Sequence, residues 1–240
     1  MPAQRSRSAE VHRPLSARSA LLSLLLGAPA EGLGAAQLVR CAAHVGISEA
    51  TARVALSRAV AAGELRREGA AYRLGERMLA RWERQGERDR VVAWDGGWEM
   101  VVVVATGRAP ADRAATRARL AAARLAELRE GVWLRPANLA RPLPPDDDLQ
   151  RFDAGPVDDP AALAARLWDL PAWAAEVAQT LATLEHTPDP ARRLAVAAHL
   201  VRLLADDPLL PAALLPAGWP AEEARRRYAA YQVELLAQSG

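Results

Sequence analysis

The sequence of 240 residues has a single cysteine, Cys41, and no lysine at all. One cysteine cannot close a disulfide within the chain, and no group of cysteines and histidines has the spacing of metal ligands. No apolar run approaches the roughly 20 residues that a membrane-spanning helix needs. We therefore predict no disulfide, no metal site, no cofactor and no membrane span.

Charge is distributed unevenly along the chain. Residues 1–90 contain 15 arginines and 9 acidic residues, a net charge of +6, whereas residues 91–240 contain 16 arginines and 20 acidic residues, a net charge of −4. A basic N-terminal region followed by a larger acidic region is typical of a nucleic-acid-binding domain joined to a regulatory or dimerising body.

Residues 46–63, GISEATARVALSRAVAAG, have the pattern of the turn and second helix of a helix-turn-helix. Ser48 is a good N-cap, and Gly63 stands where helices often end in a left-handed residue. Ala52, Ala55, Leu56 and Ala59 fall on one face at helical spacing, and this face is predicted to pack on the rest of the domain. The opposite face has small residues and arginines, which suit the major groove of DNA. The alternative is an ordinary amphipathic helix with a solvated arginine face. The predicted DNA-contacting residues of this segment are Ser48, Glu49, Ala50, Thr51, Arg53, Val54, Ser57 and Arg58.

The flanking sequence favours DNA binding. Helices are predicted over residues 15–26 and 35–45, and two short strands over 64–68 and 71–74. A hairpin directly after a recognition-type helix is typical of the wing of a winged helix-turn-helix, here spanning residues 14–75. Its arginines, Arg66, Arg67 and Arg73, are expected near the phosphate backbone or in the minor groove.

The rest of the chain predicts two further domains. After a charged helical connector over residues 76–93, residues 94–156 are expected to form a strand, a helix over 112–128, a strand and a last strand over 149–153. This order suggests half of a ferredoxin-like sandwich. Residues 157–240 are expected to be helical, with helices near 161–187, 190–205 and 222–237. The predicted fold class is therefore α+β and mostly helical.

Several separated motifs make the chain resemble the PaaX-type transcriptional repressors of phenylacetate degradation. In order they are SARSALLSLL, ISEATARVALSRAVAAGEL, WDGGW, GVWLRP, LWDLPAW and DDPLLPAALLPAGWP. The resemblance implies a cytoplasmic homodimeric repressor with a winged helix, a ferredoxin-like middle domain and a helical C-terminal domain. It also implies a palindromic double-stranded DNA operator, and release from it by an aryl-acyl-CoA thioester such as phenylacetyl-CoA.

Two further expectations concern the body of the protein. The segment ANLARPLPPDDD, residues 137–148, contains too many prolines and aspartates for the second helix of a ferredoxin-like domain. We therefore expect a trimmed sandwich, with one sheet face partly uncovered or covered by another segment. Candidate effector-binding residues are His199, Arg202 and Trp219, with the run Arg225 to Arg227 as further candidates for phosphate. For Arg202, an ion pair with Asp206 is the alternative.

Other functions have less support in the sequence. The small CRISPR-associated endonucleases share the predicted middle fold, but they carry a metal-binding aspartate at the end of the first strand. Here that strand ends in Ala105, Thr106 and Gly107. No catalytic constellation is recognisable, so no catalytic residue is predicted and the protein is not expected to be an enzyme. A DNA-binding protein that responds to no ligand remains the second reading. The signal-like run LLSLLL also fits the first helix, and we expect a cytoplasmic location.

Overall fold

The computed structural model describes residues 14–26, 32–76, 90–140, 146–156 and 158–238. The fold is α+β and mostly helical, with two antiparallel sheets, which confirms the predicted class. The chain divides into two compact units: residues 1–82, 174–207 and 220–240 form the first, and residues 83–173 and 208–219 form the second. Most of the predicted connector helix, over residues 77–89, lies outside the described residues.

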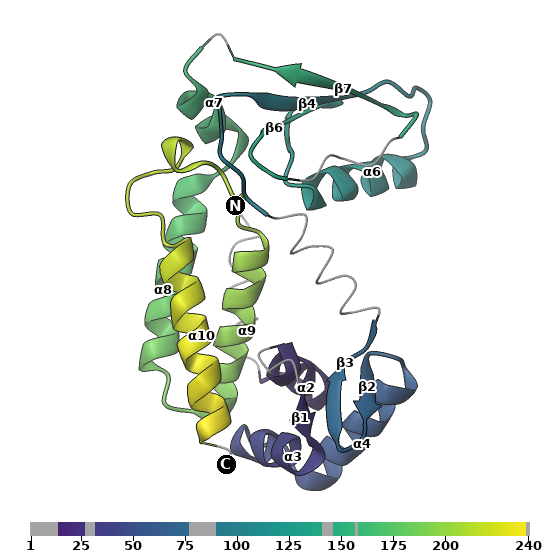
Figure 1. Ribbon diagram of the computed structural model, residues 1–240, viewed down its shortest axis with the longest axis vertical. Helices are drawn as coiled ribbons and strands as arrows, with labels where there is room; N and C mark the ends of the chain where they lie inside the picture. Colours follow the sequence, from purple (N-terminus) through teal and green to yellow (C-terminus); the bar gives the residue numbers. More distant parts are fainter. Residues whose placement is uncertain (1–13, 27–31, 77–89, 141–145, 157, 239–240) are drawn as a thin grey trace. The chain divides into compact units, whose positions relative to one another are not determined.

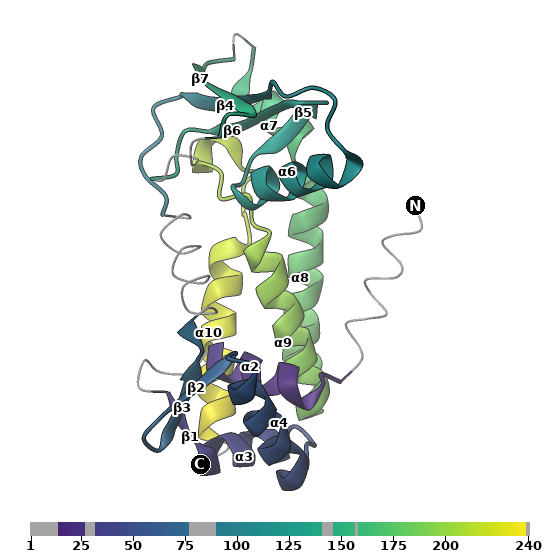
Figure 2. The same cartoon turned by 90° about the vertical axis from the view of Figure 1, so that its right-hand side faces the viewer.

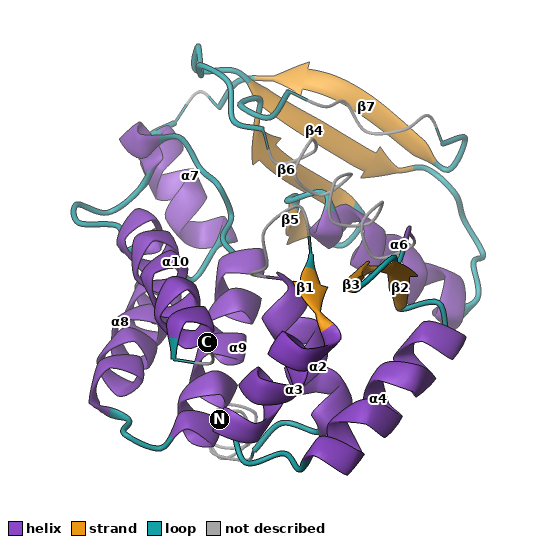
Figure 3. Cartoon of the chain, turned by 60° about the horizontal axis from the view of Figure 1, so that its bottom comes forward, coloured by secondary structure: helices purple, strands orange, loops and turns teal. Residues whose placement is uncertain are grey.

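The first unit begins with three helices and a small sheet, in the order predicted. Their apolar faces form a core that includes Leu21, Leu38 and Leu56. The sheet has the order β1-β3-β2 (Figure 3), and β1 was not predicted because two residues carry no periodic pattern. The elements are α2 (Ala17–Leu26), β1 (Leu33–Gly34), α3 (Ala35–His44), α4 (Glu49–Ala61), β2 (Leu65–Glu68) and β3 (Ala71–Leu74).

Three long helices complete the first unit: α8 (Leu170–His186), whose first turn belongs to the second unit, α9 (Pro190–Ala205) and α10 (Ala221–Ala237). They run side by side in Figures 1 and 2. Their buried positions are apolar, with Val177 and Leu200 fully enclosed. The predicted starts and ends of α9 and α10 are confirmed to within one residue.

The prediction of one helix over residues 161–187 is wrong. The chain forms α7 (Pro160–Leu167) and then α8, separated by Trp168 in an extended conformation. The Asp169 side chain accepts a hydrogen bond of 3.2 Å from the backbone N–H of Ala172. An aspartate N-cap followed by Pro171 in the first turn favours the start of a new helix at this point. The chain therefore forms two helices where one was predicted.

The second unit is built on a four-stranded antiparallel sheet of order β5-β6-β4-β7. Helix α6 (Pro110–Ala122) lies against one face of it (Figure 2), and this side has a core of Val101, Leu120, Leu125 and Trp133. The strands are β4 (Trp98–Val103), β5 (Ala126–Arg129), β6 (Val132–Pro136) and β7 (Leu149–Ala154).

The predicted helix over residues 112–128 is too long. Helix α6 ends at Ala122, because Arg124 has a positive φ of 65° and turns the chain back. The N–H of Leu125 then bonds the carbonyl of Leu120 at 3.1 Å, and β5 begins at Ala126. This is a helix stop of the kind that glycine usually makes, formed here by an arginine.

The other face of the sheet is covered without a second sandwich helix. None of the described residues between β6 and β7 (137–140 and 146–148) is helical, as the prolines and aspartates predicted. Trp98 and Leu134 instead pack on Ala164 of α7 and on Leu214 of the short helix η1 (Ala212–Leu214). A segment from the C-terminal part of the chain, together with α7, therefore covers the face opposite α6.

Candidate nucleic-acid interface

Helix α4 is fixed at both ends by local hydrogen bonds. The left-handed Gly46, with φ of +80°, turns the chain after α3, and the next N–H, of Ile47, bonds the carbonyl of Ala42 at 2.9 Å. The hydroxyl of Ser48 then accepts the N–H of Thr51 at 3.3 Å, as expected of an N-cap. At the other end Gly63 has φ of +69°. The tight turn between α3 and α4 holds one helix against the other.

The face of α4 predicted to contact DNA is exposed. Its opposite face is buried through Ala52, Leu56 and Ala59, whereas the predicted inward residue Ala55 is only half-buried. Val54, an apolar side chain, keeps half of its surface exposed. Every predicted contact residue of the segment is exposed, namely Ser48, Glu49, Ala50, Thr51, Arg53, Val54, Ser57 and Arg58.

The two arginines of α4 differ in their contacts. Arg53 lies along its own helix, and its Nε donates to Glu49 Oε1 at 2.8 Å. Both side chains are about 60 % exposed, and such an i,i+4 pair is worth only about 0.3–0.5 kcal/mol. Arg58 is exposed and makes no ion pair with any of the described residues. Little free energy is therefore needed to turn either guanidinium toward a ligand.

The hairpin divides its arginines between its two faces. Arg66 and Arg73 are cross-strand partners on one face, and both lie 3.2 Å from the carboxylate of Glu68. Arg67 is paired with Tyr72 in the register and lies on the other face, where its Nε donates to the carbonyl of Gly69 at 3.0 Å. Arg66 also lies 3.8 Å from Glu76, so the two arginines of the first face are balanced by two carboxylates.

A hollow of about 340 Å³ lies between α4 and the hairpin. Arg53, Ser57 and Val60 line it from α4, and Arg67 and Tyr72 line it from the hairpin. The structure therefore brings three of the predicted contact residues together and places Arg66 and Arg73 elsewhere. Tyr72 was missed by the sequence argument, although pairing the two predicted strands would have placed it opposite Arg67.

An ion pair ties the base of the hairpin to α2. Arg18 Nε donates to Glu64 Oε2 at 2.7 Å, and a second guanidinium nitrogen contacts the other carboxylate oxygen. This hydrogen bond holds the pKa of Glu64 below its ordinary value. The hairpin therefore starts from a fixed point on the helical core.

The candidate effector-binding residues belong to different units. In the first unit, His199 is buried on α9 with its Nε2 3.2 Å from Glu176 Oε1, and Arg202 is exposed on the same helix. In the second unit, Trp219 stacks on Trp173 with ring centroids 4.5 Å apart. The Trp219 Nε1 is buried without a hydrogen-bond partner among the described residues.

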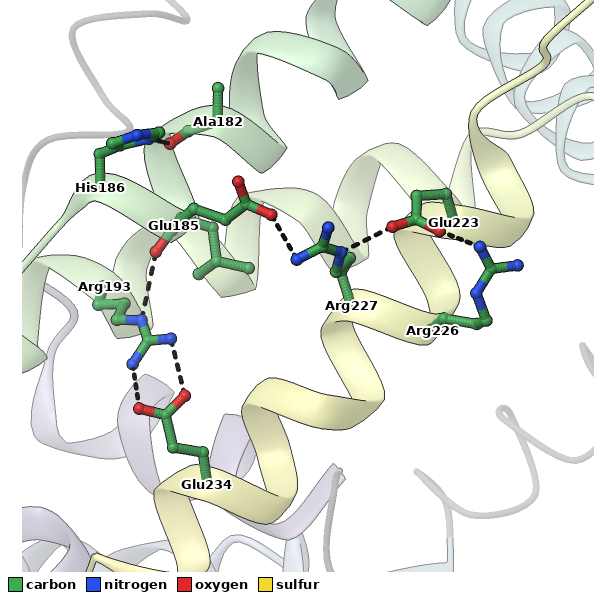
Figure 4. Close-up of polar contacts among 9 residues, drawn as sticks. Ala182, Glu185, His186, Arg193, Glu223, Arg226, Arg227 and Glu234 are labelled. Carbon is green, nitrogen blue, oxygen red and sulfur yellow. Dashed lines mark hydrogen bonds and ion pairs between the residues drawn. The ribbon is translucent and has the colours of Figure 1, made fainter.

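The arginine run at the start of α10 already has carboxylate partners. Arg225 lies 2.5 Å from the buried carboxylate of Asp207. Figure 4 shows Arg226 and Arg227 converging on Glu223, with Arg227 also 2.6 Å from Glu185 of α8. The hydrogen bond from Arg227 lowers the pKa of Glu223. Arg225 and Arg227 therefore join α10 to other segments of the chain, whereas Arg226 is paired within its own helix.

In the part of the chain that the structure describes, no group of three or more histidine, cysteine, aspartate or glutamate side chains is placed to hold a metal ion. None of the described helices combines the length and the apolar character that crossing a membrane requires. Cys41 is buried in the core of the first unit.

Comparison with known proteins gives matches along most of the chain. Residues 16–78 match a family described as PaaX-like protein, residues 91–143 its central Cas2-like domain, and residues 162–240 its C-terminal domain. No curated protein matches the chain. Among solved structures, the chain is similar to the uncharacterized protein Rv0674 from Mycobacterium tuberculosis. The two are 41 % identical with a TM-score of 0.82, over 93 % of this chain and 98 % of the other.

Proposed function

The chain belongs to the PaaX-like protein family, and on that basis we propose that it is a sequence-specific DNA-binding transcriptional repressor. In this proposal α2, α3, α4 and the β2–β3 hairpin form a winged helix-turn-helix. Helix α4 enters the major groove, and the hairpin lies along the phosphate backbone. The observation that carries the proposal is the exposed face of α4, where small side chains stand beside Arg53 and Arg58.

The small side chains of that face have a specific use in DNA binding. Ala50, Thr51 and Ser57 let the helix backbone approach the base edges, and an arginine at the border reaches guanine or phosphate. We assign base readout to Arg53 and backbone contact to Arg58. Arg67 stands across the hollow from Arg53 and supplies a further phosphate contact.

A homodimer on a palindromic operator follows from the size of one recognition helix. A single helix reads only a few base pairs. Two winged domains (the heads), with recognition helices about 34 Å apart or a multiple of that, are therefore needed to recognise a site that is unique in the genome. The second unit supports a ferredoxin-like assignment, because its four strands have the order of that fold while one helix is missing. We propose that this unit and the helices α8 to α10 form the body that holds two heads together in the cytoplasm.

The effector proposal rests on the family resemblance. An aryl-acyl-CoA thioester releases the repressor only if it binds the DNA-free arrangement more tightly than the DNA-bound one. His199 and Arg202 in the first unit and Trp219 in the second remain separate candidate contacts, and each is proposed within its own unit only. Arg202 is the cation suited to a phosphate, since it is exposed, whereas Arg225 to Arg227 are held by carboxylates.

The test is fluorescence anisotropy with DNA fragments from the promoters beside the gene. We expect one fragment to bind far more tightly than a scrambled fragment of equal length. Arg67→Ala should weaken both and reduce the slope of log affinity against log salt by about 1. Phenylacetyl-CoA should release the specific complex, with free CoA as the control. Equal binding of all fragments would contradict sequence-specific recognition, and retention of DNA with every thioester would leave a ligand-independent DNA-binding protein.

A further inference from the structure

Strand β7 forms an exposed edge of the sheet in the second unit. It is the terminal strand of the order β5-β6-β4-β7 and pairs with β4 alone, as Figure 3 shows. The four central residues, from Gln150 to Asp153, are all exposed. An edge of this kind presents unpaired backbone groups to any strand that can align with it.

The hydrogen-bond phase determines which residues of β7 face outward. The N–H of Val104 donates to the carbonyl of Asp148 at 3.0 Å, and from there the register runs through Met100 opposite Phe152. In an antiparallel pair, the backbone N–H and C=O groups of successive residues point alternately toward the partner strand and away from it. Phe152 therefore directs its backbone groups toward β4. Arg151 and Asp153 direct theirs outward. In agreement, the Arg151 carbonyl accepts a hydrogen bond of 3.3 Å from the Gln150 side chain rather than from β4.

Resting on the dimer proposed above, we infer that β7 pairs antiparallel with β7 of a second copy about a two-fold axis at Phe152. A two-fold antiparallel pair can be centred on any residue of the strand. Centring it on Arg151 or on Asp153 would place like charges opposite each other, which destabilises a sheet. Centring it on Phe152 places Arg151 opposite Asp153 of the partner subunit, twice per dimer. The sequence of β7 is therefore self-complementary in this one register.

The central pair of this register is also apolar. Phe152 leaves 44 % of its surface exposed although it is the only phenylalanine of the chain. It would meet the partner's Phe152 in a non-hydrogen-bonded pair, where side chains lie closest. The two sheets then form one continuous sheet of eight strands, with the same surface used by both copies, as a closed two-fold dimer requires.

Charge reversal tests the register in the full-length protein. Arg151→Asp alone and Asp153→Arg alone each place two like-charged pairs in the interface. We expect each to raise the dimer dissociation constant on the order of 10-fold, measured by sedimentation velocity between 1 and 50 µM. Combining the two substitutions in one chain should restore the dimer. An equimolar mixture of the two single variants should restore it as well, because every pair in the mixed dimer is then opposite in charge.

The control is Glu130→Arg, which makes the same change of charge as Asp153→Arg at an exposed position between β5 and β6. It should associate like the wild type, and all variants should keep the wild-type circular dichroism spectrum, which shows that they are folded. Single variants that dimerise normally, a mixture that stays monomeric, or a monomeric wild type would each overturn the inference. Binding to a single operator half-site separates the two proposals: it should survive in the monomeric variants, and its absence from the wild type would refute DNA binding without affecting the association result.

Discussion

Helices α4 and α10 both carry exposed arginines, but the partners of those arginines lie in different places. On α4, Arg53 contacts a glutamate one turn earlier in the same helix. On α10, Arg225 and Arg227 reach Asp207 and Glu185, which belong to other segments of the chain. An arginine paired within its own helix can leave its partner while the fold stays intact. An arginine that joins two segments cannot.

The difference separates arginines that join two segments from arginines that can turn toward a ligand, and exposure alone does not make that separation. Arg53 is 60 % exposed at its side chain and Arg227 is 54 % exposed, nearly the same. Their sequence surroundings are also alike, since each has a glutamate four residues before it. Only the location of the second carboxylate, on α8, distinguishes Arg227. Three substitutions test this comparison.

The largest effect is expected at Arg225. Arg225→Ala removes the guanidinium that lies 2.5 Å from the carboxylate of Asp207, which is only 2 % exposed. A buried charge that loses its counterion destabilises the fold, here by about 3 kcal/mol. Urea denaturation measures the loss, and adding Asp207→Asn should recover part of it by removing the charge. A loss below 0.5 kcal/mol, the size seen for ordinary surface substitutions, would show that the link between segments contributes little.

The next effect is expected at Arg53, on binding rather than on stability. Arg53→Ala should cost about 2 kcal/mol of operator affinity and relax the preference at one base pair of each half-site. The free energy of unfolding should change by less than about 0.5 kcal/mol. Arg226→Ala is the matched control, because Arg226 is also exposed and paired within its own helix. Wild-type operator affinity in Arg53→Ala, measured by anisotropy, would refute the assignment of Arg53 to base readout.

The smallest effect is expected for the pH dependence at Glu234. Two hydrogen bonds from Arg193, at 2.6 and 2.8 Å, lower the pKa of Glu234 in the folded protein (Figure 4). The ion pair therefore stabilises the fold above the ordinary pKa of about 4.5, and this contribution is lost as the pH falls through the lowered value. Because Glu234 is part-exposed, we expect Glu234→Gln to cost about 0.5 kcal/mol at pH 7.

Thermal denaturation between pH 7 and pH 3 measures this effect. The melting temperatures of Glu234→Gln and the wild type should converge below pH 4.5, whereas Glu222→Gln, at an exposed position of the same helix, should differ little at any pH. A gap for Glu234→Gln that stays constant down to pH 3 would contradict the role of this carboxylate.

Features of the fold that depend on neighbouring residues were predicted well from the sequence, and features that depend on contacts between distant segments were predicted poorly. The ends of α4 were predictable because Ser48 is a strong helix start signal and Gly63 a strong helix stop signal. The end of α6 was not, because Arg124 adopts a positive φ that its residue type does not favour. The burial of Leu120 and Leu125 on the sheet imposes that conformation, and the sheet is assembled from strands far apart in the sequence.

The candidate interface shows the same division. Helical periodicity predicted that five residues of α4 face outward, and the structure exposes all of them: Ala50, Arg53, Val54, Ser57 and Arg58. The separation of Arg67 from Arg66 and Arg73 depends on the register of the hairpin. The carboxylate partners of Arg225 and Arg227 depend on tertiary contacts, so the sequence alone suggested a phosphate site where the structure has ion pairs between segments.

The path of the chain has a consequence for its synthesis. The polypeptide passes between the two units at residues 82–83, 173–174, 207–208 and 219–220. The segments are thus interleaved, and neither unit is complete until nearly all of the chain has left the ribosome. The core of the second unit cannot be completed before residues 208–219 are synthesised, because they supply Leu210 and Leu214 to the core around Trp98. The helices α2 to α4, by contrast, are complete within the first third of translation and can fold at once. A nascent chain would therefore carry the finished domain proposed to bind DNA before it has the body proposed to pair and regulate it.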